Sequence, residues 1–176
     1  MKPTTRILTL LLAILVLSCC FAACKDANSS GDKDLNPSNS KLVFKTKTAD
    51  NADITIAVGA DADVVVTSLG NSSSVNSSES CGGFEGKDYV YTYKGFRLST
   101  TPAKNGQIVC KLELTDDSVK TPEGLYIGMS RSDAETAMKS FKAEAVGDNL
   151  TYSSEGVKLQ VIFRDGAVTG IIYVAA

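Results

Sequence analysis

The chain ends in a long run of alternating apolar residues, Leu150-Thr-Tyr-Ser-Ser-Glu-Gly-Val-Lys-Leu-Gln-Val-Ile-Phe-Arg-Asp-Gly-Ala-Val-Thr-Gly-Ile-Ile-Tyr-Val174. Glu155-Gly156 and Asp165-Gly166 interrupt this alternation. An Asp-Gly pair between alternating apolar segments is a strong signal for a tight hairpin turn. We therefore expect three strands, at 150–154, 157–164 and 167–174, joined as an antiparallel meander.

The same pattern occurs once more, earlier in the chain. Alternating residues at 89–93, 96–101 and 107–114 are separated by Lys94-Gly95 and by a turn at 103–106. A further hairpin is expected from 41–47 and 53–57. Each meander is preceded by a helix signal, because Asp61 and Ser130 are good N-cap residues before apolar positions at helical spacing.

The two segments also match each other in sequence. Val58-Gly59-Ala60-Asp61 aligns with Ile127-Gly128-Met129-Ser130, and the strand segments follow in the same order. This pattern predicts an α+β fold: a tandem repeat of one helix plus a three-stranded antiparallel meander, with the helices on one face of the sheet and an extra N-terminal hairpin. The repeats would span 41–118 and 119–176. Residues 71–80, rich in Ser and Asn, are additional in the first copy, and we expect a loop there, either a binding loop or a solvated one.

The N-terminus carries a processing signal. Lys2 and Arg6 precede an apolar run at 7–17, which is too short to span a membrane but typical of a signal peptide. Ala22-Ala23-Cys24 resembles the lipobox of bacterial lipoproteins, which implies cleavage after residue 23 and acylation of Cys24, for example with palmitate. Cys19 is an alternative lipidation site, and an ordinary secretory signal is another alternative. Residues 24–40 contain little that can be buried, and are expected to be a flexible tether.

Composition excludes several functional classes. The chain of 176 residues has 18 basic and 20 acidic residues and contains no histidine. A net charge of −2 argues against a nucleic-acid-binding protein. Without histidine the common general base and the common metal ligand are missing, and no other constellation supports catalysis. We therefore expect a protein that is not an enzyme and that needs no metal or cofactor.

Several residues are candidates for a site. Cys81 and Cys110 are predicted either to form a disulfide or to be two buried thiols. Tyr89, Tyr91 and Tyr93 alternate onto one strand face, which would serve as a binding face or pack under a helix. The strand face opposite the apolar positions carries Arg97, Lys158 and Arg164. These residues would either pair with acidic groups of a partner or simply form the solvated side of the sheet.

Three motifs carry a family resemblance: Val58-Gly59-x-Asp61, Cys81-Gly82-Gly83-Phe84 and Thr121-Pro122-Glu123-Gly124-Leu125. They resemble a lipoprotein family of Gram-positive gut bacteria. The predicted fold is similar to that of the outer-membrane assembly lipoproteins and of the beta-lactamase inhibitor protein.

A bacterial surface lipoprotein is the function that these observations predict. It would be exported, anchored through Cys24 to the outer face of the cell membrane, and would bind another envelope protein without catalysis. Two alternatives remain: an inhibitor-like protein that caps a penicillin-binding enzyme or beta-lactamase, and a structural spacer with no specific partner.

Overall fold

The computed structural model describes residues 33–35 and 37–176, which belong to one compact unit, residues 31–176. The predicted signal peptide, the lipidation site Cys24 and its alternative Cys19 lie outside the described residues. No helix among the described residues is long and apolar enough to cross a membrane.

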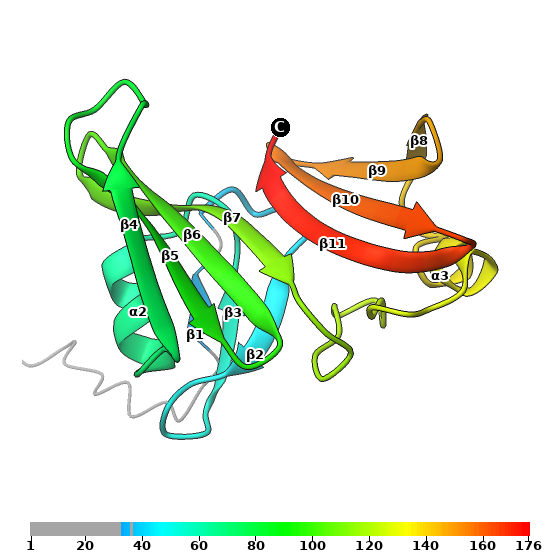
Figure 1. Ribbon diagram of the computed structural model, residues 1–176, viewed down its shortest axis with the longest axis horizontal. Coiled ribbons are helices and arrows are strands. Elements are labelled where there is room, and N and C mark those ends of the chain that lie inside the picture. The colour runs from blue at the N-terminus through cyan, green and yellow to red at the C-terminus, as the bar shows by residue number, and fades with distance from the viewer. Residues whose placement is uncertain (1–32, 36) are drawn as a thin grey trace, which may run out of the picture. The chain divides into compact units, whose positions relative to one another are not determined.

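The main element of the fold is one antiparallel sheet of eight strands, in the order β4-β5-β6-β7-β11-β10-β9-β8 (Figure 1). The strands are β4 (Ser74–Glu79), β5 (Lys87–Tyr93), β6 (Phe96–Ala103), β7 (Gly106–Leu114), β8 (Ala143–Val146), β9 (Asn149–Ser154), β10 (Val157–Arg164) and β11 (Ala167–Ala175). Each half of the sheet is a run of four consecutive strands. The halves meet where β7 pairs with β11, over four residue pairs from Leu114↔Ile171 to Lys111↔Val174.

A small second sheet covers part of the large one. It contains β1 (Lys33–Leu35), β3 (Asp53–Ile56) and β2 (Phe44–Lys47), with β1 parallel and β2 antiparallel to β3. The ring of Phe44 on β2 lies 4.9 Å from that of Phe96 on β6, measured between centroids. The predicted N-terminal hairpin is therefore present, and it packs against one face of the eight-stranded sheet.

The two helices lie on that same face and begin where the sequence predicts. Helix α2 (Ala62–Leu69) is capped by Asp61, whose carboxylate accepts hydrogen bonds from the backbone N–H groups of Asp63 and Val64. Helix α3 (Arg131–Ala137) is capped by Ser130, whose hydroxyl accepts from the Asp133 N–H. Capping satisfies backbone donors that would otherwise lack partners. The backbone before each helix also pairs with a strand. The Gly59 N–H donates to the carbonyl of Val109 on β7, and the Gly128 N–H donates to the carbonyl of Val168 on β11, both at 2.8 Å.

The core consists of cross-strand rows of apolar side chains on the covered face. One row runs from β6 to β9 through paired residues: Leu98, Leu112, Tyr173, Leu159 and Tyr152. All five side chains are buried, and they belong to one cluster with the residues of the helices and the small sheet. Because side chains alternate along a strand, the residues between them face the other way. Both halves of the sheet thus share one core.

The predicted fold class is wrong. The described part of the chain is mainly antiparallel β structure, with two helices of only 8 and 7 residues, and not a tandem α+β repeat of one helix plus a three-stranded meander. Each half holds four strands instead of the predicted three. The additional strands are β4 in the first half and β8 in the second. Both are edge strands whose residues are all exposed, so neither shows the apolar alternation on which the prediction rests.

Two boundaries differ from the prediction as well. Residues 71–80, predicted as a loop, contain β4. Residues 33–35, predicted as part of the tether, form β1 by pairing with Ile54–Ile56. Ser40, at the predicted end of the tether, is buried and its hydroxyl donates to the carbonyl of Ser154 at 2.8 Å. Backbone pairing needs no apolar side chains, so composition does not reveal such segments.

Tyr173 provides a test of the core. Its hydroxyl is buried and makes no hydrogen bond of ordinary geometry. Burial raises the pKa of Tyr173 well above 10, and Glu123 raises it further, while Thr121 partly opposes them. The unfolded chain releases this proton near pH 10 and the folded chain does not, so stability is lost as the pH rises above about 10.

We therefore expect Tyr173→Phe to change the free energy of unfolding by less than about 1 kcal/mol at pH 7, because no good hydrogen bond is lost. Between pH 8 and pH 11 the variant should lose less stability than the parent chain. Urea denaturation at both pH values measures this, with Tyr126→Phe as the control. An equal loss in parent and variant would contradict the expectation.

Candidate functional site

One face of the eight-stranded sheet is not covered by any helix or strand of the described residues. In Figure 1 no helix or strand of the described residues lies in front of β4 to β11, while α2, α3 and the small sheet lie behind. We call this surface the open face. Its central residues are Arg97, Lys111, Glu113, Lys158, Gln160, Ile162, Ile172 and Val174, each next to a buried residue on its own strand.

Aliphatic side chains lie in the middle of the open face. Ile172 pairs with Glu113 of β7 and Gln160 of β10, and Val174 pairs with Lys111 and Lys158. Ile162 lies over Gly170, where an added Cβ would be 3.1 Å from its Cδ1 atom. These three aliphatic side chains are only half-buried. An apolar centre on a sheet surface that nothing covers is a common feature of protein interfaces.

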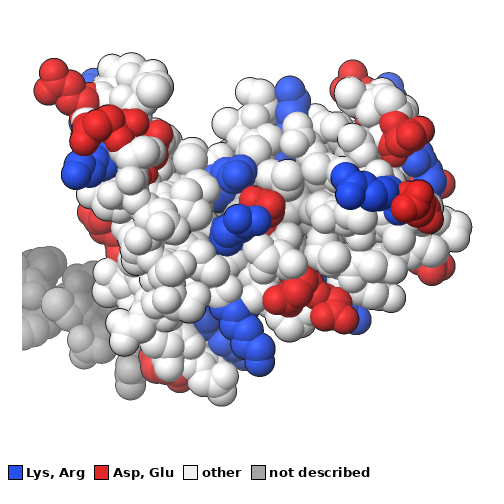
Figure 2. Space-filling model, in the orientation of Figure 1, with Lys and Arg blue, Asp and Glu red and all other residues white. Residues whose placement is uncertain are grey.

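Charged groups surround this aliphatic centre. Glu113 accepts from Arg97 at 3.1 Å and lies 3.5 Å from the ammonium group of Lys111. In Figure 2 a small group of blue and red atoms lies near the middle of this view, and further charged groups lie toward the edges. With Lys158, the centre of the open face carries three cations and one anion. The surface is therefore locally basic, although the whole chain is slightly acidic.

The open face is hollowed near its β8 edge. A cavity of about 150 Å³ is lined by Val146, Asn149, Thr151, Gln160 and Ile162. The Val146 side chain at its rim is 61% exposed. Next to it, a shallower hollow of about 490 Å³ is lined by Lys142, Ala143, Glu144, Thr151 and Ser153. These hollows could receive side chains of a partner.

The structure separates the predicted binding residues onto two faces. Arg97 and Lys158 lie on the open face, and Arg164 is exposed at the end of β10. Tyr89, Tyr91 and Tyr93 lie on the covered face, since they pair with Thr100, Leu98 and Phe96, which are buried. Tyr91 and Tyr93 pack against the core on this covered face.

The environment of the tyrosines agrees with this placement. Burial and the neighbouring Tyr91 raise the pKa of Tyr93 to about 12. Burial also raises the pKa of Tyr91, with smaller contributions from Tyr89 and from Asp63 on α2. Tyr89 stacks on Tyr91, with ring centroids 6.0 Å apart.

Cys81 and Cys110 are free thiols in this structure and do not form the disulfide considered from the sequence. Cys110 is half-buried on β7, and burial raises the pKa of its thiol, followed by the effect of Asp88. Cys81 is exposed in the loop after β4, so the alternative of two buried thiols does not describe it either.

This difference in exposure gives a measurable expectation. At pH 8, Cys81 should react with iodoacetamide at least tenfold faster than Cys110, because the thiolate is the reactive form and burial suppresses it. Mass spectrometry of the non-reduced protein at several reaction times measures both rates. Recovery of an 81–110 disulfide peptide, or equal rates, would contradict the structure.

Sequence reasoning missed one exposed aromatic residue. Phe84 lies in the loop between β4 and β5 and is 49% exposed. The backbone N–H of Ser80 donates to the carbonyl of Gly86 at 2.9 Å, which closes the base of this loop. The signal was present in the sequence, as one aromatic residue among glycines at 82–86, but its exposure became evident only from the structure.

Among the described residues, no group of three or more His, Cys, Asp or Glu side chains is arranged to hold a metal ion. Comparison with known proteins found no matching family model and no matching curated protein. Among solved structures, the chain is similar to an extracellular protein containing a SCP domain from Bacillus anthracis str. Ames, with 15% sequence identity and a TM-score of 0.44. The match covers 67% of this chain and 44% of that one, so the chain spans less than half its length.

Proposed function

We propose that this chain is an exported lipoprotein of the bacterial cell surface whose folded part binds another envelope protein through the open face, without catalysis. The observation that carries the proposal is the row Arg97, Glu113, Ile172 and Gln160, which crosses four neighbouring strands on an uncovered face. Its apolar centre favours burial against a partner, and its surplus of cations favours acidic groups around the contact.

A rigid sheet suits such a role. The buried residues behind the open face hold its backbone in place, so little ordering is required when a partner binds. Anchoring would come from the N-terminal signal, in which Ala22-Ala23-Cys24 resembles a lipobox. Two or more acyl chains on Cys24 would hold the chain on the membrane without a spanning helix.

Site-specific photo-crosslinking in intact cells tests the binding face. The full chain carries the photoreactive residue at position 160, on the open face, or at position 64, on the exposed side of α2. We expect a crosslinked partner from position 160 and not from position 64. Ile172→Glu should reduce the crosslink at least tenfold, and Arg97→Glu with Lys158→Glu should reduce it if acidic groups meet the cations. Equal crosslinking from both positions, or no effect of Ile172→Glu, would overturn the proposal.

Labelling with radioactive palmitate tests the anchor separately. The Cys24→Ser variant should lose the label and appear in the medium, while Cys19→Ser should keep both label and location. Retained label in Cys24→Ser, or its loss in Cys19→Ser, would refute Cys24 as the lipidated residue.

Phe84 favours one alternative function. An inhibitor that caps a penicillin-binding enzyme or beta-lactamase needs a side chain that enters the active-site cleft, and an exposed aromatic on a closed loop has the right form. Under this alternative, the chain inhibits one enzyme of a panel, Phe84→Ala removes the inhibition, and Ile172→Glu leaves it unchanged. Absence of inhibition across the panel would exclude it.

A further inference from the structure

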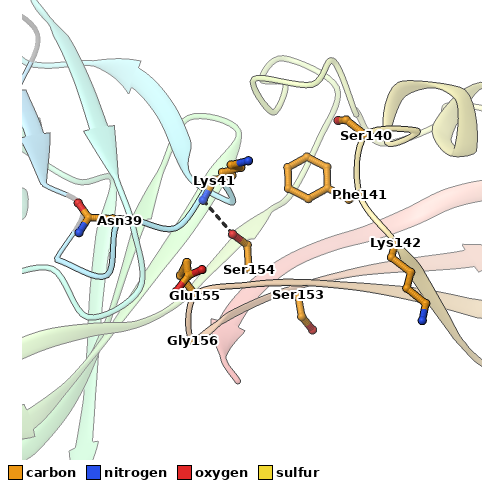
Figure 3. Close-up of a pocket in the computed structure, with 9 residues that line it drawn as sticks. All are labelled: Asn39, Lys41, Ser140, Phe141, Lys142, Ser153, Ser154, Glu155 and Gly156. Carbon is orange, nitrogen blue, oxygen red and sulfur yellow. Dashed lines mark hydrogen bonds between the residues drawn. The ribbon is translucent and has the colours of Figure 1, made fainter.

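A line of lysines crosses the strands of the open face. Four residues lie opposite one another on the neighbouring strands β7, β11, β10 and β9, in the order Lys111, Val174, Lys158 and Ser153. Lys142, just before β8, lines the same hollow as Ser153. In Figure 3 the side chains of Ser153 and Lys142 point to the side of β9 opposite that of Ser154 and Phe141. We call Lys111, Lys158 and Lys142 the lysine line.

The lysine line carries positive charge that the chain itself does not neutralise. Lys111 shares Glu113 with Arg97. Within the described part of the chain, Lys158 and Lys142 form no ion pair. Glu144 lies in the same hollow as Lys142. This part of the open face therefore has more cations than anions, with Arg97, Lys111, Lys142 and Lys158 against Glu113 and Glu144. A partner that brings acidic groups to the line is favoured.

Aliphatic groups lie on one side of the lysine line. Ile172 is two residues from Val174 on β11, and Ile162 is four residues from Lys158 on β10. Ile162 also lines the hollow of about 150 Å³, at whose rim Val146 is exposed. Four residues of a strand measure about 13 Å, which is close to the width of an α-helix with its side chains, about 10–12 Å. One helix lying along the lysine line can therefore cover both the lysines and the hollow.

The spacing of the lysines favours a helix over an extended segment. Lys111 and Lys158 are two strand spacings apart, about 10 Å. An α-helix rises about 10.5 Å in seven residues, and the seventh residue returns to the same side after two turns. An extended segment covers this distance in about three residues, and side chains three apart point to opposite sides. A segment that ran along the strands would meet only one of the two lysines.

We propose that the open face binds an amphipathic helix of the partner, which lies across the strands from β7 to β8 along the lysine line. Acidic residues seven apart on this helix pair with Lys111 and Lys158, and an aliphatic side chain of its apolar stripe enters the hollow between Ile162 and Val146. A second copy of this chain does not suit the surface, because it would bring the same cations to the contact. The inference rests on the proposed function, since it specifies which part of the partner binds the open face.

Photo-crosslinks from the two ends of the lysine line test the shape of the partner. Ser99 on β6 pairs with Lys111, and Ser153 on β9 pairs with Lys158, so positions 99 and 153 are four strand spacings apart, about 19 Å. Each position carries the photoreactive residue in a separate full-length protein in intact cells, and mass spectrometry maps the crosslinked residues of the partner. A helix places these residues about 13 apart in one acidic segment, and an extended segment places them about six apart.

We expect the helical spacing. A spacing near that of an extended segment, crosslinks in two separate segments, a crosslink to a second copy of this chain, or none from positions 99 and 153 would overturn the inference, even where position 160 crosslinks a partner. Absence of a crosslink from all three positions would refute the proposed function itself, and this inference with it. The two failures are therefore distinguishable.

Charge reversal tests the lysine line. Lys111→Glu with Lys158→Glu should reduce the crosslink from position 153 at least tenfold, while Lys111→Arg with Lys158→Arg should keep it. Lys139→Glu, just after α3 on the covered face, is the matched control and should leave it unchanged. Replacing the two mapped acidic residues of the partner by lysine should restore the crosslink of the double glutamate variant. An undiminished crosslink in that variant, or no restoration, would refute the pairing with acidic residues.

Discussion

Leu112→Ala is expected to lower the free energy of unfolding by about 2–5 kcal/mol, the range for removing a buried leucine side chain. Leu112 is 2% exposed and pairs with Leu98 on β6 and Tyr173 on β11. It lies where the halves of the sheet join through only four residue pairs. The space left by the missing side chain would be surrounded by strands that are held on both sides, so it would collapse only in part.

Urea or thermal denaturation of both proteins measures this loss. Gln160→Ala is the matched control, because it removes a side chain from the open face of the same sheet and should change stability by less than about 0.5 kcal/mol. A loss below about 1 kcal/mol for Leu112→Ala would show that the β7–β11 junction tolerates a cavity and that the two halves contribute separately to stability.

Gly95→Ala is expected to cost at least about 2 kcal/mol, because two unfavourable effects combine. Gly95 has a φ of +83°, which side chains rarely adopt. A Cβ atom there would lie 2.5 Å from the hydroxyl oxygen of Ser118 and 2.8 Å from a methyl carbon of Val119. The backbone carbonyl of Gly95 also accepts from the Thr115 N–H, so the segment after β7 is held against this turn.

Two other glycines separate the contributions. Gly106→Ala introduces strain alone, since φ is +113° but no atom lies within 4 Å of the added Cβ. Gly83→Ala introduces neither effect and should be neutral within about 0.5 kcal/mol. The free energy of unfolding should therefore decrease stepwise from Gly83→Ala to Gly106→Ala to Gly95→Ala. If Gly95→Ala were no worse than Gly106→Ala, the close approach of residues 118–119 would be refuted.

The sequence predicts well those elements whose signal is local. Asp165-Gly166 and Glu155-Gly156 place the turns between β9, β10 and β11 correctly, because tight hairpins require particular residues. The caps Asp61 and Ser130 also mark the starts of α2 and α3 correctly, although Val64, Val65 and Val66 are poor helix formers. Here burial of Val65 and Leu69 in the core outweighs propensity.

The elements that were missed have no such local signal. β4 reads Ser-Val-Asn-Ser-Ser-Glu and β8 reads Ala-Glu-Ala-Val, and both are held by backbone hydrogen bonds to one neighbour. The side of the sheet that carries the tyrosines could not be predicted either, because alternation shows that Tyr89, Tyr91 and Tyr93 share a face but not which face is covered. The hydrogen bond from Ser40 to the Ser154 carbonyl joins residues more than a hundred positions apart, so it has no local signal either.

The order of the strands has a consequence for how the chain folds. In the eight-stranded sheet every neighbouring pair except β7 and β11 is consecutive in sequence, so each pair closes a short loop. The junction between Leu114 and Ile171 must bring together distant segments, which costs more chain entropy and slows folding. We therefore expect the two four-stranded runs to form first and their junction last. Amide hydrogens along this junction would then be among the latest to gain protection from exchange as the protein refolds.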